Sequence, residues 1–268
     1  TFTGTSGSGG AFVKYDVTGG NGYTAITPSA TALTGAVATD DIRVTTAQTG
    51  FGAITVNSLN IAGAVTIGNA GDHLVIASGG LMSSSGTNTV AAATLTSGSG
   101  TLYDIAIVSH NISSDITGNI DLVKVGVGTT SYLTANSYTG TTYINEGQFR
   151  GVIGSKASAL GSGNLTFGGS PNSQATYEND TDFTRALGAG VGEVQFLGGG
   201  GLGGGSTGFS AYGAPINVDF GGAGATVTWG GAYFNPGIFT LNGGNATHVV
   251  TLINPIDLGG EQRYFRLD

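Results

Sequence analysis

Short runs in which apolar and polar residues alternate follow one another along the chain, with glycine, asparagine and serine between them. The clearest are Ala53–Val56, Ser58–Ile61, Ala64–Ile67 and His73–Ile76. A period of two is typical of strands with one buried face, and no long window shows the 3.6-residue period of an amphipathic helix. The pattern therefore predicts an all-β chain of short strands.

The spacing of these runs, about 8 to 12 residues, is compatible with a sandwich, a barrel or a solenoid. Two features favour the solenoid: the strands carry little charge on either face, and Gly98–Leu102 resembles Gly161–Leu165. Imperfect internal repeats indicate stacked units that contact only their neighbours. With coils of about 20 to 25 residues, the chain would form roughly 11 to 13 coils.

Composition supports this prediction and narrows the function. Of 268 residues, 51 are glycine and only 9% are charged, against about 7% and about 25% in ordinary domains. The 12 Phe and 10 Tyr, with many Thr, Val and Ile, argue against disorder. Cysteine is absent, which excludes disulfides and cysteine chemistry. No apolar stretch reaches the ~18 residues of a membrane-spanning helix, and eight Lys and Arg against a net charge of −8 argue against a nucleic-acid partner.

The chain divides by character into four parts. Residues 1–50 are a β segment without an assignment, and residues 51–187 are expected to form β-helix coils. Residues 188–208 are so rich in glycine that they predict a loop or linker, the alternative being a coil too tight for any Cβ. Residues 209–268 return to alternating runs and predict further coils that continue into a longer chain.

One stretch resembles a known family. Leu122–Thr129, Tyr132–Thr142 and Ile144–Gly147, with Phe149 at the last apolar position, are similar to the autotransporter-associated β-strand repeat. The resemblance implies a right-handed parallel β-helix in a secreted or surface-displayed bacterial protein, and a motif without catalytic residues. Thr130–Ser131 depart from the pattern, which predicts a longer turn there.

Candidate metal and acid–base residues are few. No two of His73, His110 and His248 have a metal-ligand spacing, and no nucleophile-elbow pattern is present. His73 and His248 open apolar strands, where surface or wall positions are expected. Glu178, Asp180 and Asp182 alternate as oxygen ligands of Ca²⁺ can, but no calcium-binding nonapeptide or 12-residue loop surrounds them. A solvated turn is therefore the favoured interpretation, and no cofactor is expected.

Two further sets of residues bear on function. Polysaccharide lyases and hydrolases also use parallel β-helices and need carboxylates gathered in a cleft. The carboxylates with a spacing that could stack them on neighbouring coils are Asp104, Asp115 and Asp121. Aromatic side chains could instead stack on sugars, although core packing is their ordinary role. These aromatic candidates are Tyr138, Tyr143, Tyr212, Trp229 and Tyr233.

The sequence thus predicts a structural scaffold without enzymatic activity, at the bacterial cell surface or outside the cell. Open solenoid ends expose unpaired backbone groups, so we expect a homo-oligomer or filament formed by end-to-end or lateral packing. The alternative is an adhesin that binds cell-surface glycans, and a polysaccharide lyase or hydrolase is the third possibility.

Overall fold

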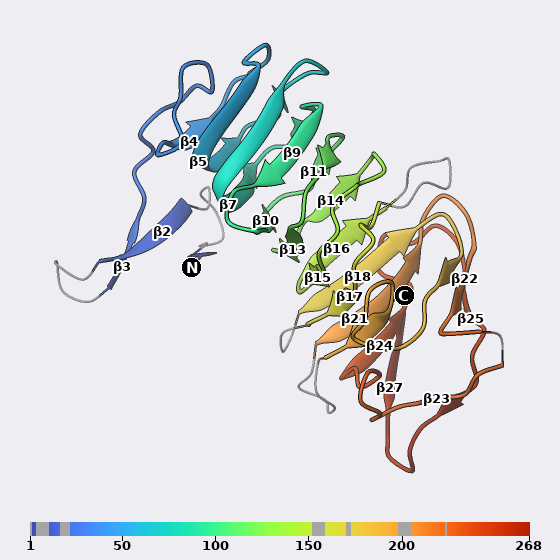
Figure 1. The fold of residues 1–268 in the computed structure, drawn as a ribbon. Coiled ribbons are helices and arrows are strands. Elements are labelled where there is room, and N and C mark those ends of the chain that lie inside the picture. Colours follow the sequence, from blue (N-terminus) through green and yellow to red (C-terminus); the bar gives the residue numbers. More distant parts are fainter. Residues whose placement is uncertain are drawn as a thin grey trace.

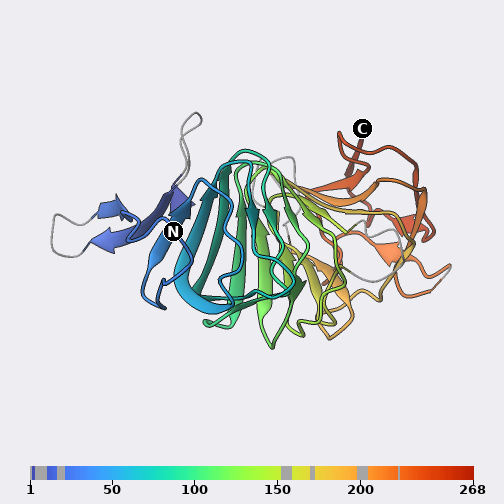
Figure 2. The ribbon, with the colours of Figure 1, turned by 90° about the horizontal axis from the view of Figure 1, so that it is seen from above.

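The computed structural model describes residues 2–3, 11–16, 22–151, 159–169, 173–197, 205–222 and 224–268. Every regular element in these ranges is a β-strand, and no helix there is long and apolar enough to cross a membrane. Most strands belong to two long sheets in which every pairing is parallel. The coils stack into a rod with the first and last strands at opposite ends (Figures 1 and 2). The predicted parallel β-helix is therefore confirmed.

The two long sheets form facing walls of the rod. The ten-stranded sheet contains β4 (Asp41–Val44), β5 (Ala53–Ala62), β7 (His73–Ser85), β9 (Thr94–Ser97), β10 (Thr101–Ala106), β12 (Asp115–Ile116), β13 (Asp121–Val125), β15 (Thr142–Ile144), β17 (Leu165–Phe167) and β20 (Val194–Phe196). The nine-stranded sheet contains β6 (Thr66–Ile67), β8 (Thr89–Val90), β11 (His110–Ile112), β14 (Thr129–Tyr132), β16 (Gly147–Arg150), β18 (Gln174–Asn179), β21 (Ser206–Ala211), β24 (Ile238–Leu241) and β27 (Tyr264–Leu267).

Smaller sheets complete the described chain. Two parallel ones lie in the C-terminal coils: β19 (Phe183–Thr184), β22 (Ile216–Asp219) and β25 (Val250–Leu252), and the pair β23 (Val227–Thr228) and β26 (Ile256–Asp257). Near the N-terminus, β1 (Phe2–Thr3), β2 (Ala11–Asp16) and β3 (Gly22–Ala25) pair antiparallel. The segment expected to be unassigned thus contains a small antiparallel sheet followed by β4, the first strand of the rod.

Parallel pairing places equivalent residues of successive coils on top of one another. One inward-facing column of the ten-stranded sheet consists of Ile42, Leu59, Leu81, Asp104, Lys124, Ile144, Phe167 and Phe196. Alternation along each strand explains this column: the residues directly before and after each of these positions point out of the rod.

The core changes from aliphatic to aromatic along the rod. Buried Leu, Ile and Val fill the coils before residue 125, whereas aromatic rings join them in the later ones. Tyr132 stacks on Phe149 at 3.9 Å, and Phe167 on Phe196 at 4.7 Å. Coil length changes as well: 20 residues separate Asp104 from Lys124, but 29 separate Phe167 from Phe196. A longer coil encloses a wider interior, which the larger side chains fill.

Parallel pairings of successive coils stack ten residues from Ala30 to Phe234, and β27 lies one coil further, so the described coils reach the lower end of the 11 to 13 expected. Two other expectations need correction. Thr130–Ser131 lie inside β14 and lengthen no turn. The glycine-rich stretch 188–208 contains β20 and the start of β21, while its residues 198–204 lie outside the described ranges.

Glycine is required where a coil turns tightly against its neighbour. Gly126 has φ +83°, and a Cβ there would overlap the Ala106 carbonyl of the coil before. Gly100 has nearly the same φ, +82°, but a Cβ there would meet nothing within 4 Å. The two glycines therefore separate the cost of backbone conformation from the cost of collision.

We predict that Gly126→Ala destabilises the chain much more than Gly100→Ala. Both variants place a side chain at positive φ, at a cost of about 1 to 2 kcal/mol. Gly126→Ala must also move a coil, so its loss in unfolding free energy should exceed that of Gly100→Ala by about 2 kcal/mol or more. Denaturant unfolding of both variants measures this, and equal losses would contradict the collision.

Candidate functional site

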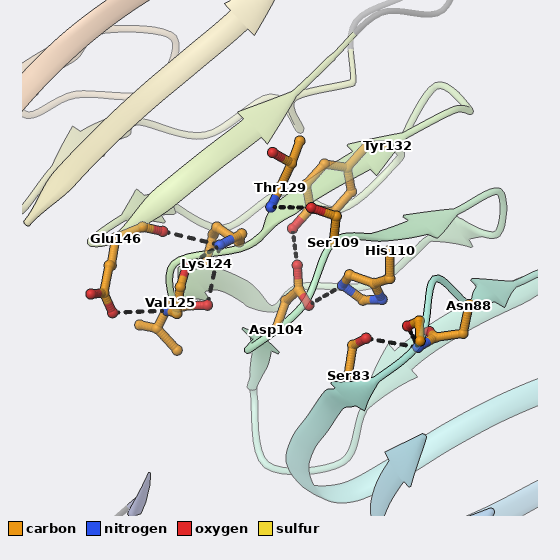
Figure 3. Close-up of polar contacts among 12 residues, drawn as sticks. Ser83, Asn88, Asp104, Ser109, His110, Lys124, Val125, Thr129, Tyr132 and Glu146 are labelled. Carbon is orange, nitrogen blue, oxygen red and sulfur yellow. Dashed lines mark hydrogen bonds and ion pairs between the residues drawn. The ribbon is translucent and has the colours of Figure 1, made fainter. Parts of the chain in front are cut away.

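A cluster of ionisable side chains lies inside the rod, where apolar residues are the rule. Asp104 of β10, His110 of β11 and Tyr132 of β14 are buried and joined by hydrogen bonds (Figure 3). Asp104 Oδ1 lies 2.8 Å from His110 Nε2, and Asp104 Oδ2 accepts a hydrogen bond from the Tyr132 hydroxyl at 2.6 Å. Both carboxylate oxygens therefore have partners from the opposite sheet.

Strand alternation places this carboxylate in the core. Leu102 and Asp104 lie two residues apart on β10 and face the same side, while the intervening Tyr103 is exposed. The register then places Asp104 between Leu81 of the coil before and Lys124 of the coil after. In the sequence, the alternation of Leu102 and Asp104 is the one signal that Asp104 is buried.

Lys124 is the second buried charge, and it holds a corner of the coil together. Its Nζ donates to the carbonyl oxygens of Val125, Gly126 and Glu146 at 3.1, 2.8 and 3.0 Å. The Glu146 carboxylate in turn accepts the Gly126 N–H at 3.1 Å. The ammonium thus bonds turns of two successive coils at the point where Gly126 takes its left-handed conformation (Figure 3).

The protonation of these groups follows from burial and from their mutual charges. Burial lowers the pKa of the Lys124 ammonium from 10.5 to about 8, against the opposing effect of the Asp104 and Glu146 carboxylates. Burial alone would raise the pKa of Asp104, but His110, Lys124 and the Tyr132 hydroxyl together hold it below its ordinary value. Burial and the neighbouring Asp104 raise the pKa of Tyr132.

An aspartate bonded to a histidine also forms two of the three members of a hydrolytic triad. Hydrolysis would further require that a substrate can reach the histidine and that a nucleophile contacts it. The side chains of both Asp104 and His110 are wholly buried. His110 Nδ1 has no hydrogen-bond partner among the described residues, and the nearby Ser83 hydroxyl accepts from Asn88 instead. The arrangement can hold two coils and two sheets together, but a substrate would have to enter the core to reach it.

The remaining predicted carboxylates do not join this cluster. Asp115 of β12 accepts bonds from the Ser137 N–H and hydroxyl, and Asp121 of β13 accepts the Thr141 N–H at 2.7 Å. Both are partly exposed, whereas Asp104 is inside. The carboxylates expected to stack on neighbouring coils therefore do not form a cleft.

The calcium candidates also have separate partners. Glu178 is fully buried and pairs with Arg150 at 2.5 Å, while the exposed Asp182 accepts the Asn217 N–H at 2.7 Å. Throughout the described ranges, no three His, Asp or Glu side chains gather where they could hold a metal ion. The structure thus does not bring Glu178, Asp180 and Asp182 together as ligands.

The histidines differ from one another. His73 and His248 are exposed, as expected of wall positions, and each ring contacts a threonine hydroxyl at 2.9 Å. His110 is the exception, because it faces inward on β11 two residues before the core residue Ile112. His110 is thus part of the core, whereas the expected wall positions concern only His73 and His248.

Two of the aromatic candidates for sugar stacking are corrected. Tyr138 and Trp229 are buried in the core, where Tyr138 contacts the Thr142 hydroxyl and Trp229 donates to the Pro236 carbonyl. Tyr143 is partly exposed and Tyr233 is 42% exposed. Tyr212 lies under the guanidinium of Arg150, 3.8 Å from the ring centroid.

Comparison of the chain with models of known protein families, with curated proteins and with solved structures finds no match. The resemblance of residues 122–149 to the autotransporter-associated β-strand repeat therefore stays a prediction. In this chain the glycines and the lysine of that stretch form the corner at Lys124 and Gly126.

We predict that Tyr132→Phe lowers the unfolding free energy by about 1 to 3 kcal/mol, because the buried Asp104 carboxylate loses a donor that water cannot replace. Tyr233→Phe removes the same atom from an exposed ring and should change stability by less than about 0.5 kcal/mol. Chemical denaturation measures both. Equal effects would show that the hydroxyl of Tyr132 does not hold the cluster.

A second prediction concerns pH. The unfolded chain binds one more proton than the folded chain between the folded pKa of Lys124, about 8, and the unfolded value of 10.5. Stability rises with pH wherever the unfolded state binds more protons, so unfolding free energy should rise by about 2 to 3 kcal/mol between pH 8 and 10. Denaturant unfolding across that range measures the slope.

Lys124→Met and Lys124→Arg are the controls for this slope. The first has no titrating group and the second keeps its charge to high pH, so neither should show the rise. Both retain every tyrosine, whose titration therefore cancels in the comparison. A wild-type slope equal to theirs would contradict the lowered pKa of Lys124.

Proposed function

We propose that this chain is a structural module, a β-solenoid rod that spaces and assembles material outside the cell or at a bacterial cell surface. The observation that carries the proposal is the unbroken ladder of parallel strands, which in the nine-stranded sheet runs from β6 to β27. Phe265 of β27 continues the inward column of Phe239 and is 44% exposed, and Leu267 is 72% exposed. These are the apolar residues on which a second copy of the chain would stack.

The backbone at the same end supports the proposal. β27 pairs with β24 along one edge, and none of the described strands pairs with its other edge. An exposed edge strand with apolar inward side chains is a template for a further parallel strand. A strand from a second copy of the chain would extend both the hydrogen-bond ladder and the aromatic core.

The interior is consistent with a load-carrying role. The ladder of the nine-stranded sheet runs without a break from β6 to β27. Core rings also contact across coils, as Phe196 of β20 does with Phe234 at 5.1 Å. The ionisable residues that could perform chemistry, Asp104 and His110, bond to one another inside the core. These features favour a scaffold over a polysaccharide lyase or hydrolase.

We predict that the wild-type chain forms end-to-end assemblies whose length grows with concentration, and that Phe265→Lys/Leu267→Lys shifts assembly to at least tenfold higher concentration. Burying two lysines in a continuing core is unfavourable unless they are paired. Sedimentation velocity and negative-stain microscopy measure the assemblies.

Val191→Lys is the matched control, because Val191 is 81% exposed on a loop before β20, away from the β27 edge. It should assemble as the wild type does. A wild-type chain that stays monomeric over the whole range, or a double-lysine variant that assembles equally well, would overturn the proposal.

A further inference from the structure

A roofed groove runs over the outer face of the nine-stranded sheet. The loop after β24 folds back across the sheet, and Asn245 Nδ2 donates to Gln148 Oε1 at 2.8 Å, linking residues 97 apart in the chain. Two adjoining hollows of about 490 and 420 Å³ lie beside this loop and share Ser109, Thr129 and Asn245. Each has a volume in the range of ligand sites, about 300 to 1,000 Å³.

Polar side chains line the groove in register with the coils. Asn111, Ser131 and Arg150 form one column across β11, β14 and β16, and Thr129 and Gln148 form the next. Successive coils repeat every ~4.8 Å. Hydroxyl and amide groups therefore recur at a regular step along the rod, which suits an extended ligand built of similar units.

The charges in the groove are neutralised by the protein itself. Arg150 pairs with the buried Glu178, whose other oxygen accepts from the Ser210 hydroxyl, and the guanidinium packs on the Tyr212 ring. At the far end of the groove Arg266 pairs with Asp268 at 2.7 Å. Glu146 also lines the larger hollow, where its carboxylate accepts the Gly126 N–H. Apart from that carboxylate, the groups left to a ligand are neutral donors and acceptors.

One amide donor at the groove lacks a partner. Gln174 lines the larger hollow, and its Nε2 has no hydrogen-bond partner among the described residues. Thr129 and Asn245 both donate to the single oxygen of Gln148. The groove thus contains polar groups whose hydrogen-bonding capacity the protein does not exhaust.

We propose that this groove binds a neutral, linear oligosaccharide lying along the rod. Such a chain presents hydroxyl groups at regular intervals and carries no charge that would need an unpaired ion. An apolar ligand would leave the amides and hydroxyls of the groove unpaired. A polyanion would find the cations of the groove, Arg150 and Arg266, already bonded to carboxylates. The proposal goes beyond the scaffold function and concerns a different face from the β27 edge.

Isothermal titration calorimetry with cellohexaose, maltohexaose, xylohexaose and a galacturonate hexamer tests it on the full chain. We expect at least one neutral hexamer to bind, and Asn111→Ala/Asn245→Ala to raise its Kd at least tenfold, because two hydrogen-bonding amides are lost. Asn119→Ala, an exposed asparagine outside the groove, should leave Kd within twofold of the wild type.

Three results would overturn the proposal. They are no binding of any neutral hexamer at millimolar concentration, binding of the galacturonate hexamer alone, and equal weakening by Asn119→Ala and the double variant. Far-UV circular dichroism and unchanged Tm confirm that the variants are folded. Because Phe265 and Leu267 are intact in all of them, a failure here leaves end-to-end assembly to be judged on its own.

Discussion

In-register parallel pairing is the constraint on which the rest of this structure depends. Because each strand bonds to the equivalent strand one coil away, every inward residue has a neighbour directly above and directly below. Leu, Ile and Val satisfy this in the first coils, and aromatic rings satisfy it in the wider later ones. A charged residue that enters such a column must find partners across the rod, which is what Asp104 does with His110 and Tyr132.

The same constraint explains the corners. A turn that repeats in every coil brings backbone against backbone, so Gly126 and Gly147 take left-handed conformations with carbonyls packed against them. Lys124 lies beside both and donates to the carbonyl oxygens of Val125, Gly126 and Glu146. The cost of burying its ammonium is thus offset by hydrogen bonds and by the Asp104 and Glu146 charges.

Much of the fold could be predicted from alternation, glycine content and low charge, because these patterns are local. The cluster could not, since it depends on register: Asp104 and Lys124 become neighbours only when one coil is 20 residues long. Coil length differs along the rod, as between the 20 residues from Asp104 to Lys124 and the 29 from Phe167 to Phe196, and the turn residues do not predict this variation. Nor does the local sequence around Tyr138 and Trp229 indicate that these rings face inward. Alternation at Leu102 and Asp104 was the one available clue to a carboxylate in the core.

The bond between Asn245 and Gln148 has a mechanical meaning. It spans β24, β21, β18 and β16, so the loop links strands of several successive coils at once. Coils that are bonded only to their neighbours can unfold one at a time under tension, whereas the coils linked by this loop must unfold together. A rod pulled in the optical trap should therefore yield coil by coil at its aliphatic end and in one larger step at its aromatic end.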